Sequence, residues 1–230
     1  YKLAINSPPN ALHGGPKGFH TKVWDVESHS DNHVQLKYVS KDGEEGYPGE
    51  LTIRVTYTLT DNDELKLKYE ATTDKTTIVN LTNHPFFNLA GIADPSPSIL
   101  NNILTLNCDK YLPINQYSIP LGEPVEVKNT PFDFTTPHTI GERINDTTNE
   151  QIKNGGGYDH CFIINQKKEG ELTYVGKCLE PESRRFIEMF TTEPAVQIYT
   201  GNFLDGCKGF HGATYPYRTG LSMESEHYPD

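Results

Sequence analysis

Two side chains that can exchange protons near neutral pH, His84 and Glu224, are the first candidates for chemistry in this sequence. His84 lies among asparagine amides and aromatic rings in residues 80–89, and Glu224 follows a short apolar stretch. An imidazole with an ordinary pKa of about 6.5 and a carboxyl group with a pKa of about 4.3 suit general acid/base catalysis. The alternative interpretations are a buried histidine satisfied by neighbouring amides and a solvated surface glutamate.

Three further polar residues are candidates for holding a ligand. His13 lies in a turn with two glycines, residues 12–15, which leaves its imidazole uncrowded. Asp159 follows three consecutive glycines, and Gln197 lies in a run that otherwise favours a strand. A surface histidine, a turn-capping aspartate and a structural hydrogen bond are the alternatives. The mixture of amides and flat rings around His84 suits a sugar.

Several common catalytic devices are absent from the sequence. It contains no G-x-G-x-x-G, no P-loop, no G-x-S-x-G and no H-E-x-x-H. The four cysteines are far apart and form no C-x-x-C, which predicts reduced, buried thiols and no zinc site or disulfide scaffold: Cys108, Cys161, Cys178 and Cys207. We therefore expect a mechanism without metal or cofactor.

The charge balance argues against two classes of partner. The chain of 230 residues has 20 Lys and Arg against 31 Asp and Glu, a formal charge of -11, which disfavours nucleic acid and anionic membrane surfaces. No apolar run approaches a membrane span, and no segment has the pattern of a signal peptide. The sequence therefore predicts a cytoplasmic protein, and the sequons at Asn80 and Asn145 matter only in a secreted one.

The positioning elements are predicted to be strands. Apolar and polar residues alternate over Leu51–Leu59 and again over 65–71, with the turn residues Asp61, Asn62 and Asp63 between them, which predicts a hairpin. Shorter runs with strand character occur at 22–26, 33–39, 76–81, 103–106, 160–164, 171–178, 185–191 and 197–199. No sustained helical periodicity, linker or repeat is present, so we expect one all-β sandwich domain over residues 1–230.

Six segments in a fixed order carry a family resemblance. They are residues 12–15, D-G-E-E-G-Y-P-G-E-L at 42–51, N-L-T-N-H at 80–84 with F-N-L-A-G at 87–91, G-Y-D-H at 157–160, residues 196–202, and Met223-Glu224. Their order and spacing resemble those of the aldose 1-epimerases, the galactose mutarotases. The resemblance covers almost the whole chain.

The resemblance implies a galactose mutarotase-like antiparallel β-sandwich, or supersandwich, that interconverts the α and β anomers of free hexoses such as galactose and glucose. By motif, Glu224 matches the general base that takes the proton of the anomeric hydroxyl, and His84 matches the acid that protonates the ring oxygen. His13, Asp159 and Gln197 match the residues that hold sugar hydroxyls. The family needs no metal or cofactor, and its substrate is a monosaccharide.

Three departures from the family pattern stand out. The family has an N-terminal segment with a sugar-binding arginine before the position of Tyr1, and further β-structure after that of Asp230. We therefore expect a sandwich without its N- and C-terminal strands, as part of a longer natural chain. Glu226 stands where glutamine is common in the family. Residues two apart on a strand share a face, so this carboxylate would raise the pKa of Glu224.

Other functions remain compatible with the sequence. A carbohydrate-binding protein without catalysis could use the same sandwich. A glycosidase would use Glu224 and Asp159 as a carboxylate pair at about 5–10 Å across a glycosidic bond. A sugar-phosphate epimerase ranks lower, because no cluster of arginine or lysine adjoins the motifs.

Overall fold

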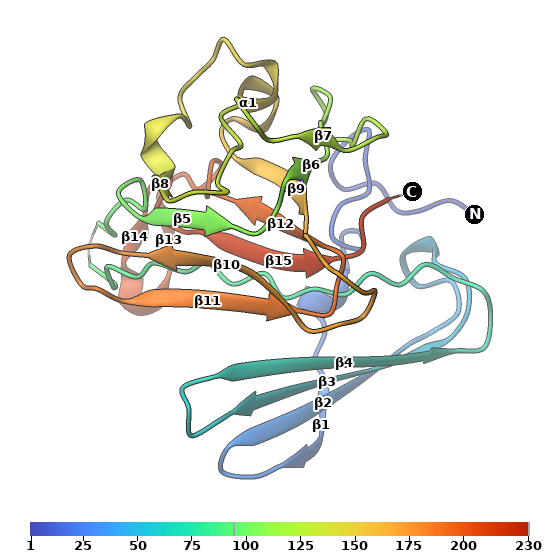
Figure 1. Ribbon diagram of the computed structural model, residues 1–230. Helices are drawn as coiled ribbons and strands as arrows, with labels where there is room; N and C mark the ends of the chain where they lie inside the picture. The colour runs from blue at the N-terminus through green and yellow to red at the C-terminus, as the bar shows by residue number, and fades with distance from the viewer. Residues whose placement is uncertain (94, 230) are drawn as a thin grey trace. The chain divides into compact units, whose positions relative to one another are not determined.

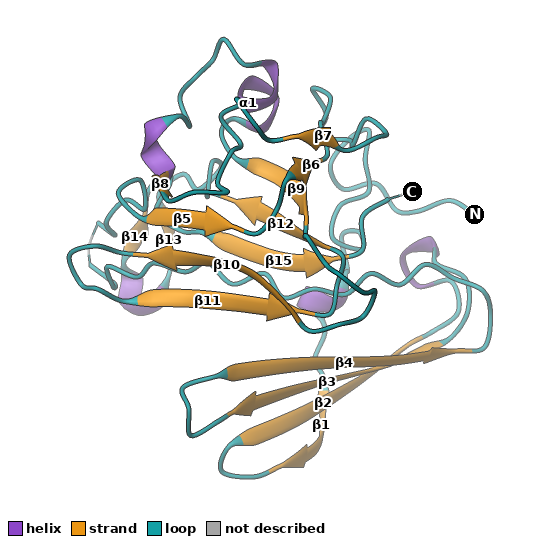
Figure 2. Cartoon of the chain, in the orientation of Figure 1, coloured by secondary structure: helices purple, strands orange, loops and turns teal. Residues whose placement is uncertain are grey.

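The regular secondary structure of the chain is mostly antiparallel strands, in a computed structural model that describes residues 1–93 and 95–229 (Figures 1 and 2). It divides into two compact units, residues 1–81 and 82–230, which we describe separately. The sequence-based assignment of one domain stays a prediction.

The first unit is built on one four-stranded sheet in the order β1-β2-β3-β4. Its elements are η1 (Phe19–Thr21), β1 (Asp25–His29), β2 (His33–Ser40), η2 (Glu44–Gly46), β3 (Leu51–Leu59) and β4 (Leu65–Thr73). In β3 the alternation of the sequence becomes an alternation of burial, with Leu51, Ile53 and Val55 buried and the intervening threonine and arginine side chains partly exposed. The predicted strand and hairpin are confirmed, with Leu51 paired to Thr73 and Leu59 paired to Leu65.

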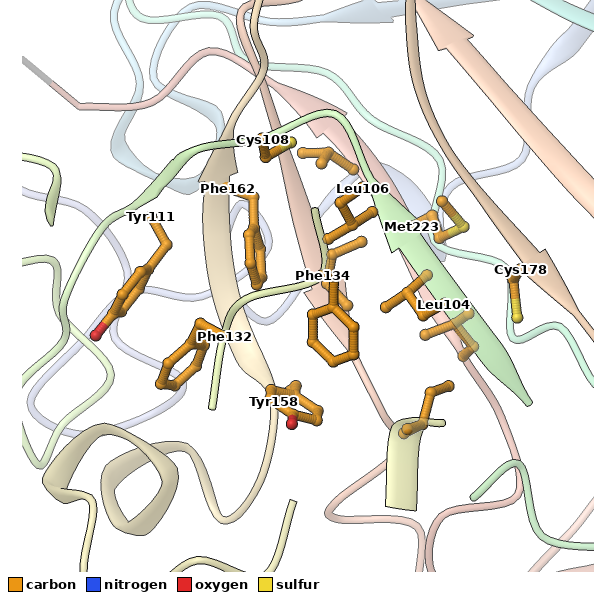
Figure 3. Packing of buried hydrophobic residues seen from close by; sticks show 14 of the residues in the cluster. Leu104, Leu106, Cys108, Tyr111, Phe132, Phe134, Tyr158, Phe162, Cys178 and Met223 are labelled. Atoms are coloured by element: carbon orange, nitrogen blue, oxygen red, sulfur yellow. The ribbon is translucent and has the colours of Figure 1, made fainter. Parts of the chain in front are cut away.

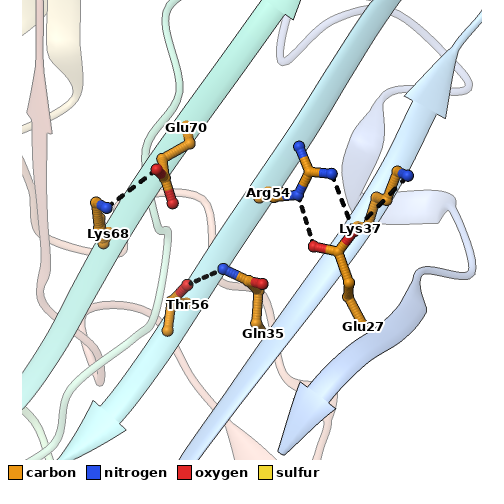
Figure 4. A network of polar contacts seen from close by, with 7 residues as sticks. All are labelled: Glu27, Gln35, Lys37, Arg54, Thr56, Lys68 and Glu70. Atoms are coloured by element: carbon orange, nitrogen blue, oxygen red, sulfur yellow. Dashed lines mark hydrogen bonds and ion pairs between the residues drawn. The ribbon is translucent and has the colours of Figure 1, made fainter.

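The polar face of this sheet carries charges of both signs in contact (Figure 4). The Arg54 guanidinium donates two hydrogen bonds to the Glu27 carboxylate, at 2.6 and 2.9 Å, and Lys37 Nζ lies 3.7 Å from the same group. Lys68 Nζ lies 3.0 Å from Glu70 Oε1. We call the surface formed by these five residues, with Gln35 and Thr56, the charged face.

The predicted strand at 76–81 is wrong. These residues are irregular, and Ile78 and Val79 are 65% and 40% exposed. Their β-branched side chains favour extended backbone, but a strand also needs a neighbouring strand to bond to, and none of the described strands pairs with this segment.

The second unit contains a four-stranded sheet in the order β11-β10-β5-β8, a five-stranded sheet in the order β15-β12-β9-β6-β7 and the hairpin β13-β14. Its elements are β5 (Ile103–Leu106), β6 (Lys110–Tyr111), β7 (Val125–Glu126), β8 (His138–Thr139), η3 (Ile140–Glu142), α1 (Glu150–Gly155), β9 (Asp159–Ile163), β10 (Thr173–Leu179), β11 (Phe186–Thr191), β12 (Ala195–Tyr199), β13 (Cys207–Lys208), η4 (Phe210–Gly212), β14 (Thr214–Tyr215) and β15 (Ser222–Glu226).

The two larger sheets of this unit enclose its hydrophobic core (Figure 3). Leu104 and Leu106 from β5 belong to the same buried cluster as Phe162 from β9, Ile198 from β12 and Met223 from β15. Two sheets that bury their inner faces against each other form a sandwich. The predicted all-β antiparallel sandwich is therefore confirmed in this unit.

A short helix precedes β9 and was not predicted. Helix α1 begins after Asn149, whose side chain accepts hydrogen bonds from the backbone of Gln151 and Ile152, and it is followed by the C-cap residue Gly156, which has a φ of 64°. Both are standard signals for helix ends, but a helix of six residues is too short to give periodicity. No helix in the described part of the chain is long and apolar enough to cross a membrane.

The cysteines are free thiols. Cys108, Cys161 and Cys178 are buried as predicted, whereas Cys207 is exposed because it lies on the small hairpin β13-β14 outside the main sheets.

Candidate active site

The five-stranded sheet of the second unit has one apolar and one polar face. Residues paired across antiparallel strands point to the same side of a sheet. Gln197 of β12 pairs with Glu224 of β15 on one side and with Cys161 of β9 on the other, while Tyr199 pairs with Ser222 and Asp159. The alternate residues of these strands form the core. We call the polar surface the site face; its members are Asp159, Gln197, Tyr199, Ser222, Glu224 and Glu226.

Asp159 and Gln197 are joined directly on the site face. The side-chain amide of Gln197 donates a hydrogen bond of 2.7 Å from Nε2 to Asp159 Oδ1. Burial raises the pKa of Asp159 to about 6, although this hydrogen bond acts in the opposite direction. The sequence-predicted pair is thus together on neighbouring strands, and it presents hydrogen-bonding groups suited to hydroxyls.

Glu224 is a nearly buried carboxyl group, with 7% of the residue exposed. Burial raises its pKa to about 8, and the negative charges of Glu226 and Asp159 add to the increase. At neutral pH the folded chain therefore favours the protonated form of Glu224. A carboxyl group that titrates near neutrality on a polar surface is typical of a functional site.

His84 reaches the site face from a segment without regular structure. Phe87 pairs with Leu221 through two backbone hydrogen bonds of 2.8 and 2.9 Å, which hold this segment beside the start of β15. His84 Nε2 consequently lies 3.5 Å from Glu224 Oε1. Burial lowers the pKa of His84 below its ordinary value of 6.5.

Because burial acts in opposite directions on the two groups, the pair of His84 and Glu224 keeps one proton over the neutral range. Loss of that proton from Glu224 is centred near pH 8, and a second proton is gained by His84 only below its ordinary pKa. A pair that holds one proton can take a proton at one oxygen of a ligand while giving one to another.

Aromatic rings surround the pair. The His84 ring centroid lies 5.0 Å from that of Phe86 and 6.2 Å from that of Tyr199, and the latter two are 5.9 Å apart. Tyr199 and Ser222 also lie close to His84 but were not among the candidates predicted from the sequence. The alternation of a strand could have identified both, because Tyr199 lies two residues from Gln197 and Ser222 lies two residues from Glu224, and residues two apart on a strand share a face.

Glu226 is the third carboxyl group of the site face. It pairs with Ala195, so it shares the face of Glu224 as the strand pattern predicts. Burial raises its own pKa, and the charge of Asp159 also raises it. Three carboxyl groups of raised pKa therefore lie on the site face, two on β15 and one on β9, with β12 between these strands.

His13 belongs to the first unit. It is exposed and has a φ of 51°, and its ring contacts that of His20 edge to face at 6.5 Å. Its role in holding a ligand stays a prediction. Within residues 1–93 and 95–229, no group of three or more His, Cys, Asp and Glu side chains is arranged to hold a metal ion.

The fold and this site define a class: antiparallel β-sandwich proteins with a carboxyl–imidazole pair on a polar sheet face. Comparison with known families specifies it further, because the family model described as aldose 1-epimerase matches residues 1–230. The chain therefore belongs to the aldose 1-epimerase family, as the motifs predicted.

Individual relatives agree with this assignment. The chain is 45% identical over 231 residues to a galactose mutarotase of Homo sapiens and 36% identical over 229 residues to an aldose 1-epimerase of Escherichia coli. These alignments cover 100% and 99% of this chain and 64% of each relative, so the chain spans less than two thirds of their length.

A solved structure gives the same fold. The crystal structure of a GalM/aldose epimerase homologue from C. elegans matches with a TM-score of 0.86 and 27% identity. The match covers 98% of this chain and 68% of that one.

Proposed function

We propose that this chain carries the acid/base centre of an aldose 1-epimerase, which interconverts the α and β anomers of a free hexose such as galactose or glucose. The observation that carries the proposal is the approach of His84 Nε2 to Glu224 Oε1, at 3.5 Å, beside the hydrogen-bonded pair of Asp159 and Gln197. Membership of the family and relatives named galactose mutarotase and aldose 1-epimerase support the same reaction.

In the proposed reaction the pair of His84 and Glu224 holds one proton throughout, first on His84 and, after ring opening, on Glu224. Glu224 as a carboxylate takes the proton of the anomeric hydroxyl, while His84 as an imidazolium gives its proton to the ring oxygen, and the C1–O5 bond breaks. Rotation about the C1–C2 bond turns the aldehyde, and the ring closes on its other face with the two groups in exchanged roles. The pair then again holds one proton, so the cycle needs no net proton uptake.

Asp159 and Gln197 supply orientation in this proposal. Their amide and carboxyl groups accept and donate hydrogen bonds on the same face as Glu224, and the Tyr199 and Phe86 rings offer flat apolar surfaces for the C–H groups of a sugar. His13 is proposed as a further hydroxyl-binding residue. A cytoplasmic location remains the prediction from composition.

Polarimetry on freshly dissolved α-D-galactose and α-D-glucose tests the proposal. We expect the chain to accelerate mutarotation and Glu224→Gln to lose about 10²–10⁴-fold in kcat/KM, the usual contribution of a general acid or base. The matched control is Glu188→Gln, which removes an exposed carboxylate from β11.

Binding measurements separate the proposal from its alternatives. Calorimetry with galactose should show that Glu224→Gln still binds sugar. A folded wild-type chain that binds galactose without accelerating mutarotation would instead be a carbohydrate-binding protein. Release of an aglycone from a glycoside would identify a glycosidase.

A further inference from the structure

Ser222, the first residue of β15, makes two side-chain contacts at the base of the site. It is completely buried. Its Oγ lies 2.8 Å from the carbonyl oxygen of Pro85 and 3.0 Å from Nδ1 of His84. Both partners belong to the segment that the Phe87–Leu221 hydrogen bonds hold beside β15.

Counting protons at Ser222 assigns the direction of both contacts. A serine hydroxyl has one proton to donate and two lone pairs that accept, whereas a backbone carbonyl can only accept. The hydroxyl proton must therefore point to Pro85, at the shorter distance. The remaining contact is a hydrogen bond only if Nδ1 of His84 carries a proton and donates it to Ser222 Oγ.

We infer that Ser222 holds the neutral His84 ring in the tautomer protonated at Nδ1, so that Nε2, which faces Glu224, is the nitrogen that gains and loses the proton. The other tautomer would place two lone pairs, those of Nδ1 and Oγ, against each other or would leave the Pro85 contact without a proton. The hydroxyl of the completely buried Ser222, 3.0 Å from Nδ1, is in position to impose this choice.

The inferred role in catalysis rests on the proposed function. With Nδ1 protonated, the lone pair of Nε2 can receive the proton of the Glu224 carboxyl group across the 3.5 Å contact. The products of that transfer are the carboxylate and the imidazolium with which the proposed reaction begins. With the proton on Nε2 instead, neutral His84 would have no lone pair facing Glu224. Ser222 is thus a positioning residue that acts through His84.

His160, a second buried histidine, has the opposite tautomer and can serve as an internal reference. The backbone N–H of Asp159 donates to Nδ1 of His160 at 3.1 Å, so Nδ1 is the acceptor and neutral His160 carries its proton on Nε2. Burial lowers the pKa of His160 to about 3, so this ring stays neutral throughout the range of the experiment.

A long-range ¹H–¹⁵N correlation spectrum of the imidazole rings tests the assignment in the full chain. Such a spectrum distinguishes protonated from unprotonated ring nitrogens, and the signals of His84 are those lost in His84→Gln. At pH 7.5 we expect His84 to show protonated Nδ1 and His160 to show protonated Nε2. In Ser222→Ala we expect His84 to change to the pattern of His160 or to a mixture.

The wild-type spectrum alone decides the tautomer, even if Ser222→Ala does not fold. Protonated Nε2 and unprotonated Nδ1 on neutral His84 would overturn the inference, and so would a His84 pattern unchanged in a folded Ser222→Ala. If no chain accelerates mutarotation, the proposed function fails while the spectrum still reports the tautomer.

Kinetics tests the positioning role separately. We expect Ser222→Ala to lower kcat by about tenfold with little change in KM, since the lost hydrogen bond orients the acid and does not touch the sugar. Ser222→Thr, which keeps the hydroxyl, should recover most of this loss. The matched control is Ser225→Ala on the opposite face of the same strand. An unchanged kcat in folded Ser222→Ala would exclude the positioning role.

Discussion

The charged face of the first unit and the site face of the second unit shift the pKa values of their carboxyl groups in opposite directions. On the charged face Glu27 lies between Arg54 and Lys37, and the hydrogen bonds from Arg54 hold its pKa below the usual value. On the site face, burial raises the pKa values of Glu224, Glu226 and Asp159, and neighbouring negative charge adds to the increase for Glu224 and Glu226.

Exposure and neighbouring charge explain the contrast between the two faces. The Glu27 side chain is 32% exposed and the Glu224 side chain 9%, so solvent stabilises the first charge and only weakly the second. A sheet selected for stability alone would pair or remove a buried carboxyl group. The site face keeps three, and buried carboxyl groups of raised pKa gathered on one surface are typical of a functional site.

The largest expected effect is on the free energy of unfolding, when Glu224, the site-face carboxyl group whose pKa is raised to about 8, is replaced by an uncharged residue. In the folded chain the pKa of Glu224 is about 8, against 4.5 for an ordinary glutamate, so the folded state binds more protons than the unfolded state between these values. Stability from this group is therefore lost as pH rises through that window. Glu224→Gln should stabilise the chain by about 3–5 kcal/mol at pH 9 and by little at pH 4.5.

Urea unfolding of both proteins at the two pH values measures this difference. The control is Glu188→Gln, whose stability relative to wild type should not depend on pH in the same way. An equal change at pH 4.5 and pH 9 would mean that Glu224 is not held protonated by its surroundings.

An intermediate effect is expected when one like charge is removed from the site face. Wild-type kcat/KM should fall at high pH with a midpoint near 8, where the pair loses its proton, and at low pH below the ordinary pKa of His84. The charge of Glu226 raises the pKa of Glu224, so Glu226→Gln should move the alkaline midpoint to lower pH, by about one unit or less.

The pH–rate profile by polarimetry checks this shift against Glu171→Gln, an exposed carboxylate outside the site. If the alkaline midpoint stays in place or moves to higher pH in Glu226→Gln, the charge of Glu226 does not raise the pKa of the His84–Glu224 pair.

The smallest effect is expected on the charged face. Arg54→Ala removes the bidentate partner of Glu27, but the pair is partly exposed and Lys37 remains close to Glu27. Thermal unfolding should therefore shift by no more than a few degrees, and added salt should reduce the difference. A loss of stability as large as the gain in Glu224→Gln would contradict the comparison, because it would mean that exposed pairs matter as much as buried charge.

The sequence predicted the elements whose signal is local. The alternation over β3 marks both ends of that strand, and the runs that became β5, β9, β10 and β11 lie within two residues of their predicted bounds. The strand predictions that were wrong or missed have a physical cause. The 76–81 segment has strand propensity without a partner, and two-residue strands such as β6 and β8 exist only through their neighbours.

For the site, residue types and family motifs identified His84, Asp159, Gln197 and Glu224, and period two would have added Tyr199 and Ser222. Their convergence was not predictable from local pattern. His84 meets β15 because Phe87 bonds to Leu221 and Ser222 contacts His84, more than a hundred residues later, and such pairings have no local signature.

The Phe87–Leu221 pairing also has a consequence for stability: the site should open locally at a lower free energy than the whole sandwich unfolds. The segment that carries His84 is held by one isolated backbone bridge at Phe87 and Leu221 and by the side-chain contacts of Ser222 rather than by a ladder, and contacts of this kind open at a lower free energy than the sheets around them. We expect each opening to withdraw the imidazole of His84 from the carboxyl group of Glu224 while the sandwich stays intact. On heating, catalysis should cease before the core melts, and amide hydrogen exchange at Phe87 and Leu221 should be faster than at Ile198 in the centre of β12.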